Sequence, residues 1–393
     1  MMGKWENCTI ADLGTVVGGA TPSTKRSENF EGGTIAWITP KDLAGFKGRF
    51  ISHGERNLTE KGLKSCSAQM MPKHTILFSS RAPIGYVAIA SNEVCTNQGF
   101  KSIVPNDRID YMFLYYLLLY YKNNIKQMAS GTTFKEISGK AMRSIKVCIP
   151  EAKEEQIKIS SILSAIDSKI EENERINKNL YQQLFALYDY YCDSADDGEI
   201  ELGALCQFQE GYVNPAQTHP EYFDGDVKWL RAVDINESFI IETSRTLTQT
   251  GFQSAKKSAY LFSPNTIAIS KSGTIGRLGI VGDYMCGNRA VINIAPKDPL
   301  LLPYIYAFLK SHQKQFPDLA VGSVQKNLYV SLLEPLPVRI LALDSLSEFC
   351  NAGNAILNAV YNNCQENIRL AQLRDTLLPR LMTGELDVSR LTL

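Results

Sequence analysis

Two long stretches of the chain carry apolar residues three or four positions apart. The first has no proline or glycine between Glu151 and Asp197. Its apolar positions are Ile159, Ile162, Ile166, Ile170, Ile176, Leu180, Leu184 and Leu187. This spacing predicts one amphipathic helix of about 35–40 residues, on the order of 50–60 Å long. A second helix is predicted from Asp344 to about Met382, where leucine, isoleucine, valine and phenylalanine recur in the same way.

Helices of this length need something to cover their apolar stripes. We expect the two helices to pair antiparallel and to bury the stripes against each other, with a globular region at each end. In the alternative, each helix docks only on its own globular region. Asn173 and Asn177 interrupt the first stripe. They either fix the register of a helix–helix seam or lie on the surface. The leucines of residues 371–387 exceed what one seam can hide, which is typical of a partner surface.

Outside these helices, short β-branched runs separated by turn residues occur twice, about 191 residues apart. The matched pairs are Trp37 with Trp229, Gly85 with Gly276, Asn97 with Asn288, Pro105 with Pro296 and Gly131 with Gly322. Glycine and proline fix turns, so both copies should share one backbone. We predict two domains of one design, related by a pseudo-two-fold axis. Two copies of one recognition domain indicate a target with two separate features to be recognised. A duplication that only enlarged a scaffold is the alternative.

The boundaries follow from these patterns. The first domain is placed at residues 1–150, the first helix at 151–195, the second domain at 196–341, and the second helix with its tail at 342–393. Each domain should be α+β, but the pattern does not determine strand order. The apolar run Tyr111–Tyr121 is too short to span a bilayer and is predicted to be a buried helix, matched by the run from Pro303. Trp37 and Trp229 are expected in the core.

Composition and charge narrow the class of protein. Hydrophobic residues make up 44% of the 393 residues, as in ordinary globular proteins, and the first ten residues do not resemble a signal peptide. Nine scattered cysteines without a CxxC pair favour reduced thiols in the cytoplasm over disulfides. The four isolated histidines predict no metal site.

The net charge of zero is a sum of unlike parts. Residues 1–150 carry 19 Lys/Arg against 11 Asp/Glu, whereas residues 201–340 carry 13 against 12. The basic excess of the first copy is a mild argument for a nucleic-acid partner, which the second copy weakens. An ordinary solvated surface is the alternative for both copies.

We find no motif for catalysis in the sequence. There is no GxxxxGK[ST] phosphate loop, no GxGxxG after a strand, no HExxH, no GxSxG elbow and no [NDS]PP[YFW] tetrapeptide of an amino-methyltransferase. Ser270-Lys271 could be read as a Ser–Lys nucleophile. A turn or binding loop is the better interpretation, because Ser79-Ser80-Arg81 occupies the same place in the first copy.

Several stretches carry a family resemblance when they are taken together. They are GGATPST, GGTIAWITPKDL, LFSSRAPIGYVAIA, TNQGFK, SGTTFKEIS, EEQIKISSILSAIDSKIEENERIN and LRDTLLPRLMTGELDVSRL. They resemble the DNA-specificity subunit of type I restriction–modification systems over essentially the whole chain. In the second copy GYVNPAQ replaces GGATPST and GNRA replaces TNQG. The resemblance implies an α+β fold: two similar globular target-recognition domains separated by two long antiparallel helices, the coiled-coil spacer.

The resemblance also implies a function. A non-catalytic subunit of this kind reads a split double-stranded DNA site, one half with each domain, and the helices set the unread gap at about one helical turn or slightly more. Two modification (methyltransferase) subunits that use S-adenosylmethionine would join it, together with restriction (motor-nuclease) subunits that use ATP and Mg. The chain itself would bind no cofactor. A fused methyltransferase or nuclease with an unrecognised motif, and a coiled-coil adaptor without nucleic acid, are the alternatives.

Candidate DNA-binding residues lie on the loops that end strands, since side chains inside a sheet are buried. Lysine and arginine can contact guanine or phosphate, glutamine can pair with adenine, and phosphate contacts are the commoner outcome. In the first copy the candidates are Arg81, Lys101, Thr132, Thr133 and Lys135. In the second copy they are Lys271, Arg277, Arg289, Gln325 and Lys326.

Overall fold

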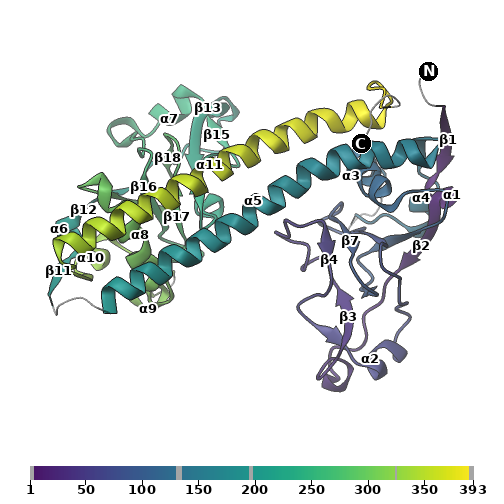
Figure 1. Ribbon diagram of the computed structural model, residues 1–393, viewed down its shortest axis with the longest axis horizontal. Coiled ribbons are helices and arrows are strands. Elements are labelled where there is room, and N and C mark those ends of the chain that lie inside the picture. The colour runs from purple at the N-terminus through teal and green to yellow at the C-terminus, as the bar shows by residue number, and fades with distance from the viewer. Residues whose placement is uncertain (1–3, 130–134, 194–197, 324, 389–393) are drawn as a thin grey trace. The chain divides into compact units, whose positions relative to one another are not determined.

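The computed structural model describes residues 4–129, 135–193, 198–323 and 325–388 (Figure 1). The chain divides into two compact units. Unit 1 comprises Met1–Glu171 and Arg369–Leu393, and unit 2 comprises Glu172–Ile368. Each unit therefore contains one globular domain and one end of each long helix.

Unit 1 contains three small sheets. The largest has the strand order β2-β9-β6-β7-β4, the second β5-β3-β8, and the third pairs β1 with β10. Most pairs are antiparallel, but β4 with β7 and β3 with β8 are parallel. The strands are β1 (Trp5–Thr9), β2 (Gly14–Gly18), β3 (Ile35–Ile38), β4 (Phe50–Ile51), β5 (Asn57–Leu58), β6 (Ile76–Phe78), β7 (Val87–Ala90), β8 (Cys95–Thr96), β9 (Lys101–Pro105) and β10 (Lys146–Pro150). The helices of this domain are α1 (Ile10–Leu13), α2 (Glu60–Lys64), α3 (Tyr111–Gln127) and α4 (Gly139–Arg143), with the 3₁₀ turn η1 (Ser27–Asn29).

Unit 2 repeats the same three sheets, in the orders β12-β19-β16-β17-β14, β15-β13-β18 and β11-β20. The two parallel pairs, β14 with β17 and β13 with β18, recur in equivalent places. The strands are β11 (Glu199–Glu201), β12 (Cys206–Glu210), β13 (Phe223–Leu230), β14 (Phe239–Ile240), β15 (Thr246–Leu247), β16 (Thr266–Ser270), β17 (Leu278–Val281), β18 (Cys286–Gly287), β19 (Val291–Pro296) and β20 (Pro337–Arg339). The helices are α6 (Leu202–Leu205), α7 (Gln249–Gln253), α8 (Leu302–Ser311), α9 (Phe316–Leu319) and α10 (Val330–Leu333). The 3₁₀ turns are η2 (Pro220–Tyr222), η3 (Ala232–Asp234), η4 (Lys256–Ser258), η5 (Pro299–Leu301) and η6 (Gln313–Gln315).

The matching sheets confirm the predicted α+β domains of one design. The apolar runs form buried helices as predicted: α3 has its central side chains in the core of unit 1, and α8 is buried in unit 2. Trp37 and Trp229 are core residues as expected, each 5% exposed. The indole Nε1 of Trp37 donates to the Ala20 carbonyl at 3.2 Å, and that of Trp229 donates to the Val213 carbonyl at 2.8 Å.

The two long helices are α5 (Lys153–Asp193), with 41 residues, and α11 (Leu343–Met382), with 40 residues. Within unit 2 they run antiparallel. The residue numbers of the contacting positions on α11 decrease as those on α5 increase. Asn173 donates to Glu366 at 2.7 Å, and Asn363 donates to Asn177 at 2.8 Å. Both asparagines of α5 are buried. They therefore lie on the helix–helix seam, where an amide pair disfavours slippage.

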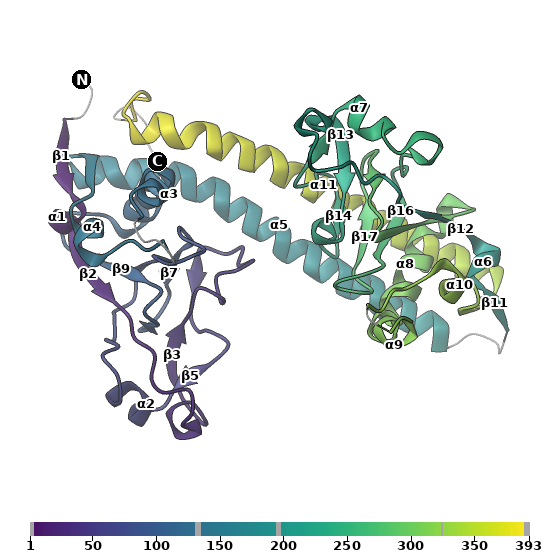
Figure 2. The ribbon, with the colours of Figure 1, turned by 180° about the vertical axis from the view of Figure 1, so that it is seen from behind.

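Each helix also packs on the domain of its own unit. Ile159 and Leu163 of α5 belong to the core of unit 1, and Leu184 and Tyr188 belong to the core of unit 2. In unit 1, α3 lies beside the first turns of α5, where Tyr116 donates to Asp167 at 2.6 Å (Figure 2). The helices pair with each other as expected, but their stripes also bury against the domains, because each domain offers a helix and a sheet face to the same stripe.

Two further sequence expectations concern membranes and thiols. None of the helices in the described ranges is long and apolar enough to cross a bilayer. All nine cysteines are free thiols in the structure. Burial raises the pKa of Cys95 and of Cys286 to about 12. These two thiols stay protonated at neutral pH and are poor nucleophiles.

Candidate nucleic-acid interface

The loop that leaves β6 in unit 1 is closed by a serine and a glycine. The Ser79 hydroxyl donates to the Pro83 carbonyl at 2.8 Å and accepts from the Tyr86 amide at 2.8 Å. The Gly85 amide donates to the Ser79 carbonyl at 2.9 Å. Gly85 has a φ of +92°, which favours glycine. This is why glycine ends the loop that carries Arg81.

The loop that leaves β16 in unit 2 is built in the same way. Ser270 donates to the Thr274 carbonyl and accepts from the Arg277 amide at 2.8 Å. Gly276 donates to the Ser270 carbonyl at 3.0 Å and has a φ of +86°. The Ser270 hydroxyl is thus engaged by backbone groups, and Lys271 Nζ turns to Glu210 instead. These contacts favour the turn over a Ser–Lys nucleophile.

Three loops meet at one residue in each unit. In unit 1 the Ser80 amide donates to Gly99 at 2.7 Å, and its carbonyl accepts from the Ile137 amide at 2.9 Å. In unit 2 the Lys271 amide donates to Ala290 at 2.7 Å, and its carbonyl accepts from Leu328 at 2.9 Å. The structure therefore brings together the loops on which the candidate residues were predicted.

In unit 1 two candidate cations share one carboxylate. Arg81 Nε lies 2.9 Å from Glu136 Oε2, and Lys101 Nζ lies 3.1 Å from Glu136 Oε1. Burial alone would raise the pKa of Glu136, but hydrogen bonds from Lys101 and Arg81 lower it below its ordinary value. The carboxylate is therefore ionised at neutral pH. A DNA phosphate would have to compete with Glu136 for both cations.

In unit 2 Lys271 has a similar partner from a different element. Its Nζ lies 2.9 Å from both carboxylate oxygens of Glu210 on β12, and 4.8 Å from the ring centroid of Tyr329. Arg277, Arg289 and Lys326 are exposed. In the ranges that the structure describes, none of these three forms an ion pair. Among the candidate cations of this unit, these three therefore have no carboxylate partner that a ligand would have to displace.

The remaining candidates lie in or next to segments outside the described residues. Thr132 and Thr133 lie outside the described residues, and the exposed Lys135 follows them. Gln325 is exposed. Sequence reasoning missed Glu136 and Glu210, although Glu136 stands inside the quoted SGTTFKEIS stretch. A search restricted to groups that bind DNA passes over the acids that hold those groups.

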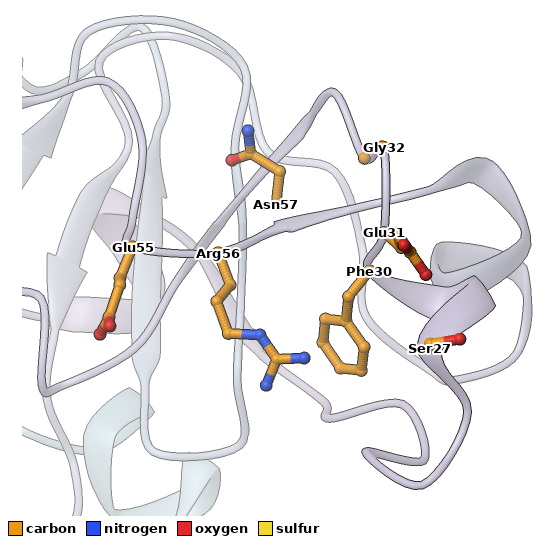
Figure 3. Close-up of a pocket in the computed structure, with 8 residues that line it drawn as sticks. Ser27, Phe30, Glu31, Gly32, Glu55, Arg56 and Asn57 are labelled. Atoms are coloured by element: carbon orange, nitrogen blue, oxygen red, sulfur yellow. The ribbon is translucent and has the colours of Figure 1, made fainter.

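A separate feature of both domains is an arginine stacked on a phenylalanine. Figure 3 shows the guanidinium of Arg56 facing the ring of Phe30, 3.9 Å from its centroid, in an open hollow of about 470 Å³. Arg245 lies 4.1 Å from the Phe223 ring in unit 2. No candidate residue lines the hollow, whose rim includes Glu31 and Glu55. Sequence reasoning missed this stack, because 25 residues separate Phe30 from Arg56.

The comparisons with known proteins identify the family. The model of the type I restriction modification DNA specificity domain matches residues 2–182 and 197–344. The chain belongs to this family. The specificity subunit of the type I restriction enzyme MjaIX of Methanocaldococcus jannaschii is 32% identical, with 98% of this chain and 94% of that protein covered. The HindI specificity subunit of Haemophilus influenzae is 25% identical, with 83% and 89% covered.

A solved structure agrees on the fold. The type I restriction–modification S subunit from M. genitalium matches with a TM-score of 0.57 and 18% identity, and 96% of each chain is covered. The specificity-domain family has two matched regions in this chain, one in each half, as the internal repeat predicted. Among the alternatives, neither a fused enzyme nor a simple adaptor is favoured, because these relatives are specificity subunits.

Proposed function

We propose that this specificity subunit reads a bipartite DNA site. Each unit would contact one half-sequence with its three-loop surface, which is formed by the loops that meet at Ser80 in unit 1 and at Lys271 in unit 2. The observation that carries the proposal is the repeated meeting of three loops at Ser80 and at Lys271, with different side chains on the same backbone. A shared backbone places two readers on DNA in the same way, and different side chains let them read different bases.

The proposal includes partners that are absent from the structure. The chain would act in the cytoplasm with two modification subunits, which bind S-adenosylmethionine, and with restriction subunits, which use ATP and Mg. Its own role would be recognition and assembly. The names of the relatives, which are specificity subunits of type I restriction enzymes, support a role with modification and restriction partners.

We further propose that the two long helices set the unread gap between the half-sequences. The test inserts one heptad into both helices at the borders of the units, between Glu171 and Glu172 and between Ile368 and Arg369. Seven residues add about 10 Å of helix and almost whole turns, so each stripe keeps its direction. The gap should grow by about three base pairs, while both half-sequences stay unchanged.

The measurement is a methylation map of a host that carries the variant with its modification partners. A heptad in α5 alone is the matched control. It shifts the Asn173 and Asn177 contacts against α11 and should reduce methylation without producing a new gap. An unchanged gap in the doubly extended variant would show that the helices do not set the spacing.

A further inference from the structure

Two lysines of unit 1 lie across the loop that carries Arg81. Lys122 and Lys126 are on the last turns of α3, four residues apart and hence on one face. A Cβ atom added to Gly85 would lie 3.0 Å from Lys122 Cγ and 3.0 Å from Lys126 Cε. The stems of both lysines therefore pack on the glycine of the β6–β7 loop.

The charges of these lysines are not balanced by a nearby acid. No ion pair of either lysine occurs in the described part of unit 1, where Glu136 is held by Arg81 and Lys101. Burial and the neighbouring Lys126 lower the pKa of Lys122 below its ordinary value. Like charges four residues apart on a helix repel each other and destabilise the helix. The free protein therefore gains nothing from this pair of charges.

Unit 2 shows that covering the glycine does not require charge. The equivalent Gly276 is covered by the side chain of Phe316 and by the Gln313 carbonyl. A Cβ atom added to Gly276 would lie 3.0 Å from Phe316 Cβ and 3.4 Å from the Gln313 carbonyl oxygen. Gln313 Nε2 also donates to the Gly276 carbonyl at 2.9 Å. A neutral cover thus holds the same turn. The positive charge in unit 1 is an addition that the fold does not need.

We propose that Lys122 and Lys126 bind the phosphate backbone of DNA beside the Arg81 loop, as a sequence-independent anchor that unit 1 has and unit 2 lacks. The inference rests on the proposed function, because it assigns a ligand to the edge of the same three-loop surface. An ammonium group binds phosphate as a point charge without demanding a fixed orientation. Such a contact holds the protein on the duplex and reads no bases.

The Arg56 hollow is the competing phosphate site in this unit. It is less suited to an anion, because Glu31 and Glu55 line it with Arg56. Two carboxylates near one guanidinium repel a phosphate dianion or diester. The lysine pair at Gly85 has two cations and no partner carboxylate among the described side chains.

The test measures DNA binding of the full-length chain as a function of salt, with a fluorescent duplex of arbitrary sequence as the probe. Each lost phosphate contact lowers the slope of log K against log salt by about 0.9. The double variant Lys122→Gln/Lys126→Gln should therefore reduce the slope by roughly 1.8. Between about 50 and about 200 mM salt, the wild type should lose about tenfold more affinity than the variant.

Two further variants separate phosphate binding from a loss of fold or of net charge. Lys122→Arg/Lys126→Arg keeps both charges and should restore the slope. Lys61→Gln/Lys64→Gln removes two lysines of α2 that Glu28 and Glu60 already neutralise, and should leave the slope near that of the wild type. An unchanged slope in Lys122→Gln/Lys126→Gln, or an equal fall in the α2 control, would overturn the inference.

The same experiment distinguishes this inference from the proposed function. If the wild type does not bind duplex DNA in a salt-dependent way, both fail. If the wild type binds and the Lys122→Gln/Lys126→Gln variant binds equally well at every salt concentration, only the lysine anchor fails. A variant that binds arbitrary DNA normally but loses its mapped site would assign base reading to these lysines, against the inference.

Discussion

Unit 1 and unit 2 hold their three loops with the same hydrogen bonds but place different side chains on them. Ser79 and Ser270 close equivalent turns, and Asn97 and Asn288 each accept from an amide two residues later, at 2.9 and 3.0 Å. At the positions of the two cations and their shared acid, Arg81 corresponds to Ser272, Lys101 to the buried Ile292 and Glu136 to Asn327. Small polar residues and glycines fix the backbone, so the exposed side chains can change without changing the fold.

The units also differ in how their domains dock on α5. In unit 1 Arg49 is buried, and its guanidinium donates to both carboxylate oxygens of Glu171, at 2.9 and 2.8 Å, to the Ser168 hydroxyl at 2.8 Å and to the Ser164 carbonyl at 3.3 Å. The hydroxyl of the equivalent Ser238 in unit 2 makes two neutral contacts, with the Tyr181 hydroxyl at 3.2 Å and with Cys364 Sγ at 3.6 Å. The backbone carbonyl of each residue also accepts a hydrogen bond from an amide of the neighbouring strand. The donor is Ile89 for Arg49 and Ile280 for Ser238. One position therefore carries an ion pair in one unit and a hydroxyl in the other.

The largest expected effect tests this difference in docking. Arg49→Ala leaves Glu171 without its partner and should lower the free energy of unfolding of unit 1 by about 3 kcal/mol, the low end for a broken buried pair. The low end applies because the Glu171 side chain is 34% exposed. Ser238→Ala should cost unit 2 only about 0.5–1.5 kcal/mol. Urea unfolding of each full-length variant measures both, and equal losses would show that the ion pair contributes no more than the hydroxyl.

The next largest effect sharpens the comparison of the loops. Arg81→Ala should weaken or relax recognition of one half-sequence by about 1–3 kcal/mol if Arg81 contacts a base. Arg277→Ala should do the same for the other half. Methylation maps of hosts that carry each variant with its modification partners measure the two halves separately. Loss of both half-sequences in the Arg81 variant would point to misfolding rather than to a reader confined to unit 1.

The smallest effect depends on pH. Burial alone would raise the pKa of Glu171, but hydrogen bonds and charge from Arg49 lower it below its ordinary value of 4.5. Because the folded pKa is the lower one, the stability from this pair is complete above about pH 4.5 and is lost as pH falls through the folded value. The difference in unfolding free energy between wild type and Arg49→Ala should therefore shrink below pH 4.5. The Ser238→Ala difference has no such cause and should stay constant, and parallel curves for both variants would contradict the assignment.

The sequence predicted the features that depend on hydrophobic periodicity and on the glycine and proline residues that fix turns. The stripes of α5 and α11, the buried helices α3 and α8, and the repeat around Gly85 and Gly276 follow from local patterns. Strand order did not follow, because β4 joins β7 and β3 joins β8 across intervening elements. The acids that hold Arg81, Lys101 and Lys271 were missed for a similar reason. Glu136 and Glu210 meet these cations only after separate segments have folded together.

The candidate site was thus predicted as a set of loops and not as a set of interactions. The choice of loops followed from their places at strand ends, where side chains leave the sheet, whereas their convergence came from the structure. Which charges are available did not follow, because an exposed lysine and an ion-paired lysine look alike in a sequence. The Lys122–Lys126 pair illustrates the same limit. The predicted helix ended at Tyr121, before both lysines, and their approach to Gly85 depends on how α3 packs on the sheet.

Unit 1 is assembled from both ends of the sequence, and this has a consequence for the order of folding. Its core takes in Leu381, Met382 and Val388 beside Ile10 and Leu13. A ribosome makes all of residues 172–368, the whole of unit 2, before these three side chains exist. The first domain therefore cannot complete its core until the whole of unit 2 has been synthesised, unlike a domain that folds in the usual N-to-C order. A chain that stops near residue 368 would keep a finished second domain beside a first domain whose core is still open.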